Sequence, residues 1–323
     1  MRPLKFHPIL KQTLWGGERI IPYKELASGL SRVGESWELS GMPGSESVVA
    51  EGPWAGSTLS ELIGRFGAEL LGKANYARFG QEFPLLVKFI DAREDLSIQV
   101  HPDDELARKR HGKSGKCEMW YVLEAELGAS LLTGFSRPIA PAEYERRVAD
   151  NTLTDVLNRQ AIASGDVFYL PAGRVHSIGK GSFIVEIQQS SDITYRIYDF
   201  DRRDAAGNSR ELHTELAREA IDFESSENSR ITYAPENNQE VRLVTTPYFT
   251  TSLYTLTART RCDWSATDSF VAIVLLQGSG SLTDNEGNRI DVRQGETWLL
   301  PASTQWTEIT PHTAPLRLLT SRI

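Results

Sequence analysis

The chain has 323 residues, enough for a substantial core and, as a first expectation, about two domains. Its 35 lysines and arginines stand against 43 aspartates and glutamates, so a net charge of −8 argues against a basic surface for nucleic acid. We expect neither a signal peptide nor a membrane span, and Cys117 and Cys262 are too few and too far apart for a disulfide framework or a thiolate metal cluster. These features favour a cytoplasmic protein.

The N-terminal part of the chain begins with glycine- and tryptophan-rich runs that are typical of turns and short strands. Apolar residues at helical spacing predict a helix over 57–71, with Ser57 or Ser60 as its N-cap. Residues 83–90 then form a nearly continuous apolar run that predicts a strand. Lys88 interrupts this run, so its side chain either reaches out from an edge or faces a pocket.

Two later segments alternate polar and apolar residues in the manner of strands that border a pocket. Ser97, Gln99 and His101 alternate with a leucine, an isoleucine and a valine, so all three polar groups point to one side of a strand. Lys116 and Glu118 repeat this pattern. Two neighbouring strands can therefore offer an amide, an imidazole, a carboxylate and an ammonium to one pocket, which suits a metal site with charged neighbours.

A third segment supplies a second imidazole. In residues 165–176 an apolar strand is followed by a Pro/Gly turn, and His176 lies where the chain re-enters a sheet. Further strands over 183–188 and 194–198 carry polar residues at alternate positions, among them Glu186 and Arg196. These strands again direct charge to one face.

Helices are predicted between and after these strands, over 103–111, 141–160 and 211–222. The middle segment has the pattern of one or two helices inserted beside the sheet.

The C-terminal part of the chain returns to β character after a run of Ser, Asn and Glu over 224–238. We therefore predict a catalytic domain over residues 1–230 and a second β domain over residues 231–323. The second domain repeats the strand-turn-strand pattern of 165–172 over 295–302, which indicates an internal duplication. The second copy has no histidine after its Pro-Ala pair, so we expect no metal there.

The metal-site interpretation has to be weighed against simpler ones. Single histidines such as His7, His111, His213 and His312 are more often solvated or capping residues than ligands. An alternating strand can also be an ordinary amphipathic strand with its polar side in water. The convergence of separate segments favours the metal site, because they carry ligand types that suit a divalent ion of borderline softness. Those segments are marked by Gln99, His101, Glu118 and His176, beside the cationic Lys88, Lys116 and Arg196.

Several motifs of the chain also match a known family. They are Pro84-Leu-Leu-Val-Lys88-Phe-Ile-Asp-Ala, Leu96-Ser-Ile-Gln-Val-His-Pro-Asp, Gly115-Lys-Cys-Glu118-Met-Trp-Tyr, Pro171-Ala-Gly-Arg-Val-His176-Ser-Ile-Gly-Lys-Gly and Ser191-Asp-Ile-Thr-Tyr-Arg196-Ile-Tyr-Asp. With these motifs the chain resembles the type I mannose-6-phosphate isomerases of the short bacterial form. The resemblance runs from Trp15-Gly-Gly to the end of the chain.

The resemblance implies a mainly β fold with two cupin-like (jelly-roll) β-barrels and a few flanking helices. It implies one zinc ion per chain, with other divalent transition metals possible, held by residues matching Gln99, His101, Glu118 and His176. It also gives roles to the polar neighbours of the metal. Arg196 matches the active-site arginine, Lys116 the lysine beside the metal glutamate, and Ser97 with Lys88 the phosphate contacts.

The implied reaction interconverts mannose 6-phosphate and fructose 6-phosphate through an enediol intermediate. A metal ion can act as a Lewis acid or anchor the sugar hydroxyls, and an arginine can donate to the developing oxyanion. The predicted catalytic residues are Arg196, Lys116 and Glu186. The general base stays open among Glu186, Lys116, a metal-bound hydroxide and a carboxylate near Asp199.

Other functions fit a cupin-like fold as well. One is a different sugar-phosphate isomerase, for example one acting on glucose 6-phosphate, and another is a non-catalytic metal- or sugar-binding cupin. An iron oxygenase would more often use two histidines and one carboxylate without Lys116 and Arg196 nearby. The expected partner is a small sugar phosphate, with no nucleic acid and no membrane. The sequence sets no oligomeric state.

Overall fold

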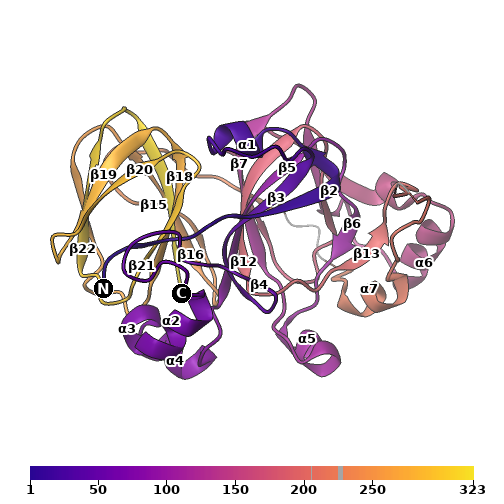
Figure 1. Cartoon of the computed structure of the whole chain (residues 1–323). Coiled ribbons are helices and arrows are strands. Elements are labelled where there is room, and N and C mark those ends of the chain that lie inside the picture. The colour runs from indigo at the N-terminus through magenta and orange to yellow at the C-terminus, as the bar shows by residue number, and fades with distance from the viewer. Residues whose placement is uncertain (205, 225–227) are drawn as a thin grey trace.

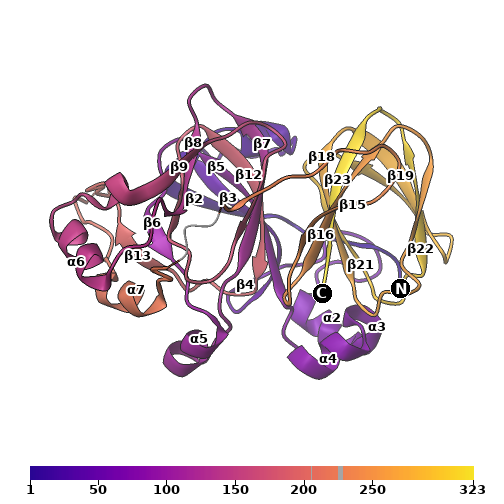
Figure 2. The same ribbon diagram turned by 180° about the vertical axis from the view of Figure 1, so that it is seen from behind.

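The protein is described by a computed structural model that covers residues 1–204, 206–224 and 228–323. Two β-barrels lie side by side, with helices at their edges (Figures 1 and 2). All strands pair with antiparallel neighbours within four sheets. The mainly β prediction of two cupin-like barrels with a few helices is confirmed.

The first barrel is built from an eight-stranded and a five-stranded sheet. The larger sheet has the spatial order β14 (Arg230–Ile231), β10 (Val167–Leu170), β7 (Glu118–Ala125), β12 (Ser182–Gln189), β5 (Leu85–Ala92), β2 (Ile9–Gly17), β3 (Val33–Met42) and β4 (Ser45–Glu46). The smaller sheet has the order β13 (Tyr195–Tyr198), β6 (Ile98–Val100), β11 (His176–Ile178), β8 (Ser130–Phe135) and β9 (Leu157–Ala161).

The second barrel is built from a six-stranded and a four-stranded sheet. The six-stranded sheet has the order β1 (Leu4–Lys5), β21 (Thr297–Leu300), β18 (Val271–Gln277), β23 (Leu316–Arg322), β16 (Thr250–Leu256) and β15 (Val241–Thr245). The four-stranded sheet has the order β17 (Thr260–Asp263), β22 (Trp306–Pro311), β19 (Ser279–Asp284) and β20 (Arg289–Arg293). The N-terminal strand β1 therefore pairs in the sheet of the second barrel. The domain boundary after residue 230 stays a prediction.

The same pairing order recurs in the two barrels. β7 lies between β10 and β12 in the first, and β18 lies between β21 and β23 in the second. This agreement fits the duplication indicated by the sequence. The interior of the second barrel is a cluster of buried apolar side chains that includes Trp264, Trp298 and Leu318.

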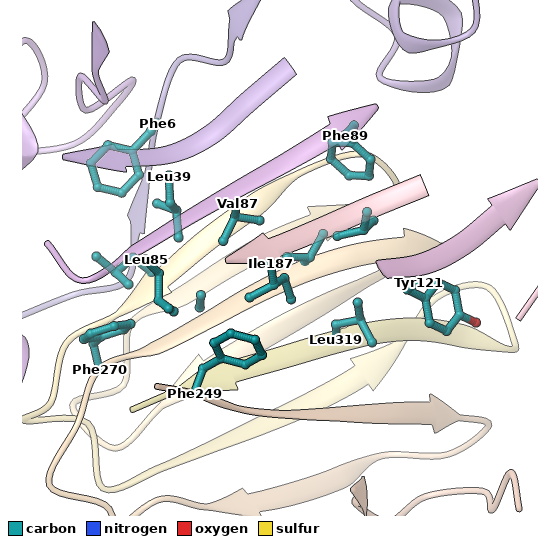
Figure 3. Packing of buried hydrophobic residues seen from close by; sticks show 14 of the residues in the cluster. Phe6, Leu39, Leu85, Val87, Phe89, Tyr121, Ile187, Phe249, Phe270 and Leu319 are labelled. Carbon is teal, nitrogen blue, oxygen red and sulfur yellow. The ribbon is translucent and has the colours of Figure 1, made fainter. Parts of the chain in front are cut away.

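The central strands of the first barrel are buried on both faces. One face of β5, β7 and β12 contributes Val87, Met119 and Ile187 to a hydrophobic core that also contains Phe249 and Leu319 of the second barrel (Figure 3). Because side chains alternate along a strand, the neighbouring residues of β5, β7 and β12 point into the first barrel. The packing between the barrels thus fixes which side chains face the interior.

The helices agree with the predicted segments in part. They are α1 (Ile20–Tyr23), α2 (Leu59–Phe66), α3 (Ala68–Leu71), α4 (Lys73–Phe79), α5 (Asp104–His111), α6 (Pro141–Ala149), α7 (Thr214–Ala220) and the 3₁₀ turn η1 (Leu153–Val156). The prediction of a single helix over 57–71 is wrong. Gly67 breaks it with a backbone φ of 49°, which glycine adopts at little cost.

Two further details differ from the sequence prediction. The N-cap of α2 is Thr58, because it forms a capping box in which its hydroxyl accepts from the backbone N–H of Glu61 and its own N–H donates to the Glu61 carboxylate. The helical interpretation of 141–160 fails at its end, where β9 pairs with β8. Pairing with a neighbouring strand overrides a weak local helical pattern there. Among the described residues, no helix is long and apolar enough to cross a membrane.

We predict that Phe270→Ala destabilises the whole chain. Phe270 is fully buried in the core between the barrels, and its ring centroid lies 4.8 Å from that of Phe83. Removing a buried phenyl ring should lower the free energy of unfolding by about 3–5 kcal/mol. Denaturant unfolding measures this loss, with Leu127→Ala in the exposed turn between β7 and β8 as the control. A loss no larger than in the control would show that the barrels do not share a stabilising core.

Candidate functional site

A cavity of about 130 Å³ lies inside the first barrel, where the predicted polar side chains face one another. The predicted residues that line it are Lys88, Ser97, Gln99, Lys116, Glu186 and Arg196. Trp15 covers part of the wall. The alternation seen in the sequence is therefore realised, with polar groups inward from both sheets.

Three predicted metal ligands converge beside this cavity. His101 follows β6, Glu118 begins β7 and His176 begins β11, and all three side chains are buried. The Nε2 atom of His176 lies 3.2 Å from Oε1 of Glu118, and Nε2 of His101 lies 3.6 Å from Oε2 of Glu118. One ligand atom from each residue lies within 4.8 Å of the others, so the group could hold a metal ion.

Gln99 completes the predicted set. It pairs with His176 in the sheet, and its Nε2 lies 3.3 Å from Nε2 of His176. The other end of the amide accepts a hydrogen bond from Ser97 Oγ at 3.3 Å. A 180° rotation of the amide exchanges its nitrogen and oxygen, so the same position can present a carbonyl oxygen to an ion between the imidazoles.

The protonation pattern of the two histidines suits metal binding. Nδ1 of His101 lies 2.7 Å from the carbonyl oxygen of Ile193, and Nδ1 of His176 lies 2.8 Å from that of Arg174. A proton on each Nδ1 can donate to these carbonyls, which leaves the lone pair of each Nε2 directed at the cluster.

Burial keeps both imidazoles neutral at pH 7. Burial, followed by the positive charge of Lys116 and by the repulsion that a protonated His176 would exert, holds the pKa of His101 well below its usual value. Burial also lowers the pKa of His176 to about 4, against the hydrogen bond to the Arg174 carbonyl. Neutral imidazoles are the form that binds a metal ion.

The Glu118 carboxylate shows why a cation fits here. Both of its oxygens and Nε2 of His101 are buried without a hydrogen-bond partner in the described ranges, although Lys116 Nζ lies 3.0 Å from Oε2 of Glu118. Burial and the charge of Glu186 raise the pKa of Glu118. Leaving such acceptors unsatisfied in a dry interior is costly, so the donor set fits a divalent ion that accepts their lone pairs.

Two lysines and two carboxylates alternate next to the cluster. Lys88 Nζ lies 3.0 Å from Oε1 of Glu186, and Lys116 Nζ lies 3.8 Å from the same oxygen. Burial acts to raise the pKa of Glu186, but the charges of Lys88 and then Lys116 outweigh it and the pKa falls. For Lys88 burial acts downward, and Glu186 with Glu35 raises its pKa instead. Both groups therefore stay charged.

Arg196 occupies the other side of the cavity. It lies on β13 opposite Gln99 of β6, and its Nη1 donates to the carbonyl oxygen of Glu211 at 3.0 Å. Its buried Nε has no hydrogen-bond partner within the part of the chain that the structure describes. Burial and the nearby Arg210 lower the pKa of Arg196. One donor of the guanidinium thus remains available to a ligand.

Sequence reasoning missed two charged residues of the cavity wall, Glu35 and Arg210. Glu35 alternates with the buried strand residues around Trp37, so a search for inward-facing polar positions could have found it. Arg210 comes from the polar segment after β13 and donates from its Nε to Oδ2 of Asp199 at 2.8 Å. A segment without periodicity gives no signal for the direction of its side chains. One candidate for the general base was a carboxylate near Asp199, and the Asp199 carboxylate itself accepts this hydrogen bond from Arg210.

The fold and the site together define a class, the cupin-like double-barrel proteins with a candidate metal centre in the first barrel. Comparison with known proteins narrows this class. Residues 4–136 match the family model described as phosphomannose isomerase type I, catalytic domain. The chain belongs to this family, the mannose-6-phosphate isomerases of type I.

Individual relatives support this assignment along almost the whole chain. Two Bacillus subtilis proteins, the probable mannose-6-phosphate isomerase GmuF and the mannose-6-phosphate isomerase ManA, are each 34% identical over 93% of this chain and 93% of the relative. The crystal structure of the mannose 6-phosphate isomerase from Bacillus subtilis is 30% identical, with a TM-score of 0.89 over 100% of both chains. The likeness therefore includes both barrels.

We predict that His101→Ala loses bound metal. Its imidazole supplies one of the three converging ligand atoms, and a site with one ligand fewer holds a divalent ion far more weakly. Metal analysis after zinc loading and gel filtration should fall from about one ion per chain to near none. The control is His7→Ala, which removes an exposed imidazole. Equal zinc content in both variants would rule out His101 as a ligand.

Proposed function

We propose that this chain interconverts mannose 6-phosphate and fructose 6-phosphate with one divalent metal ion, zinc in the first instance. The observation that carries this proposal is the convergence of His101, Glu118 and His176 beside a cavity with cationic walls, in a member of the type I phosphomannose isomerase family. The amide of Gln99 is the proposed fourth ligand. A cytoplasmic location stays a prediction from the sequence.

The charge of the cavity supports an anionic substrate. The side chains that line it include four cations, Lys88, Lys116, Arg196 and Arg210, and two carboxylates, so the wall has a surplus of two positive charges. The chain as a whole carries a net charge of −8. A local cationic surface inside an acidic protein attracts the negative charge of a phosphate group and favours the binding of a ligand that carries one.

The proposed reaction moves one proton from C2 of the aldose to C1, while a hydroxyl proton moves from O2 to O1. A divalent ion held by the ligand set supplies Lewis-acid stabilisation of the sugar oxygens. The groups proposed to handle the protons are Glu186 and Lys116, whose charged ends lie 3.8 Å apart. Arg196 is proposed to donate from its free Nε to the oxygen on which negative charge develops.

Ser97 and Lys88 are the proposed phosphate contacts. Both side chains line the cavity and both are buried. Lys88 also pairs with Glu186 at 3.0 Å and lies 3.8 Å from Glu35. In this proposal Lys88 interacts with both the phosphate and two carboxylates. The kinetics of a variant without this charge can show which of the two interactions matters.

The proposed function is tested by an isomerisation assay of mannose 6-phosphate to fructose 6-phosphate. We expect activity in the purified chain, loss of activity after chelation, and recovery on addition of zinc, because the lone pairs of His101 and Glu118 have no hydrogen-bond partner among the described residues. Glucose 6-phosphate serves as the alternative substrate in the same assay. Turnover of glucose 6-phosphate alone would replace the proposed substrate, and full activity after verified metal removal would contradict the metal dependence.

We predict that Lys88→Ala mainly raises KM, by roughly tenfold or more, because a charge-assisted contact to phosphate is lost. Steady-state kinetics over a wide range of mannose 6-phosphate concentrations measures this. Lys88→Arg is the matched variant that keeps the charge. A fall in kcat with unchanged KM would instead show that Lys88 serves to hold Glu186, the partner that it contacts at 3.0 Å.

A further inference from the structure

His213 makes two hydrogen bonds with Arg196 at the outer edge of β13. β13 is the edge strand of its sheet, so its outward N–H and C=O groups have no neighbouring strand. The backbone N–H of His213 donates to the carbonyl oxygen of Arg196 at 2.6 Å. The backbone N–H of Arg196 in turn donates to Nδ1 of His213 at 3.2 Å. His213 therefore satisfies both edge groups of Arg196, as a paired strand residue would.

The same segment also holds the other end of Arg196. Nη1 of the guanidinium donates to the carbonyl oxygen of Glu211 at 3.0 Å, two residues before His213. On its inner side Arg196 lies opposite Gln99 of β6. Arg196 thus lies between Gln99, a proposed metal ligand, and the segment 211–213. Within that segment, His213 contacts Arg196 through its side chain.

The imidazole of His213 is not used as a helix cap. His213 stands at the N-cap position of α7, but its side chain makes no capping hydrogen bond in the described part of the chain. The capping role considered for His213 is therefore not found, and its side chain is partly exposed. Its ring faces β13 and lies 6.4 Å from the ring of Tyr195, and less than a quarter of the side chain is exposed.

We infer that His213 is a positioning residue for Arg196, and that its imidazole holds the backbone from which the guanidinium reaches into the cavity. This inference rests on the proposed function, in which Arg196 stabilises the developing charge. The backbone bond from His213 to Arg196 would survive any substitution except proline, which has no N–H. The bond from Arg196 to Nδ1 depends on the side chain, and a residue that lacks an acceptor there leaves the Arg196 N–H without its partner.

The contact requires an acceptor atom at the position of Nδ1. The Arg196 N–H donates to the lone pair of this nitrogen, so a side chain without an acceptor there cannot replace the imidazole.

The test compares His213→Ala with His213→Asn in the metal-loaded chain. Asparagine places an oxygen near the position of Nδ1, whereas alanine has no acceptor there. For His213→Ala we expect kcat to fall roughly three- to tenfold with little change in KM, since one hydrogen bond is lost. His213→Asn should restore most of kcat. His312→Ala, at an exposed histidine of the second barrel, is the control.

Hydrogen exchange of the peptide that contains Arg196 provides a readout independent of activity. The Arg196 amide should exchange faster in His213→Ala than in His213→Asn. Equal kcat and equal exchange in His213→Ala and the parent would overturn the inference, as would equal losses in the alanine and asparagine variants. Arg196→Lys separates the proposed catalytic role of Arg196 from its contact with His213. Parent kcat in Arg196→Lys would overturn the proposed role of Arg196, while faster exchange in His213→Ala would still support the contact itself.

Discussion

The site depends on one electrostatic constraint, the burial of the Glu118 carboxylate beside two imidazole nitrogens. These groups present lone pairs to one another, and burial removes the water that would otherwise satisfy them. Their backbone partners reinforce the arrangement, because the hydrogen bonds at Nδ1 of His101 and His176 turn both Nε2 atoms toward the carboxylate. Beside the Lys116 ammonium, a divalent cation is the group that would satisfy these lone pairs, and the cluster could hold one.

The two barrels show how little has to change to gain or lose such a site. In the first barrel Glu118 pairs with Leu170, the residue before Pro171-Ala172. In the second barrel Val271 pairs with Leu300, the residue before Pro301-Ala302. The position of the carboxylate is thus taken by a buried valine within an apolar cluster. The same strand pairing therefore yields a polar cavity in one half and a packed core in the other.

The sequence predicted the polar face of the site well because a strand has a period of two. Ser97, Gln99 and His101 had to share a side, and the apolar residues between them had to be covered. The capping box at Thr58 was missed because other possible N-caps lie close by in the sequence. The strand β9 was missed because it forms by pairing with β8, which is distant in the sequence. Arg210 was missed for another reason. It reaches the cavity from an irregular segment, where no local pattern determines the direction of a side chain.

The charged residues of the cavity form a series that alternates in sign. From Glu35 the series passes to Lys88, Glu186, Lys116 and Glu118, with separations of 3.8, 3.0, 3.8 and 3.0 Å. Each charge has an oppositely charged neighbour, so removal of Lys88 or Lys116 leaves the carboxylate at that end of the series, Glu35 or Glu118, without its lysine. Effects of single substitutions in this series should consequently be non-additive, and a double-mutant cycle is needed to apportion them.

The series also couples the candidate metal carboxylate to the proposed phosphate contact. A ligand that binds at Lys88 and an ion that binds at Glu118 therefore interact with the same charged side chains. Binding at one position changes the electrostatic free energy of binding at the other.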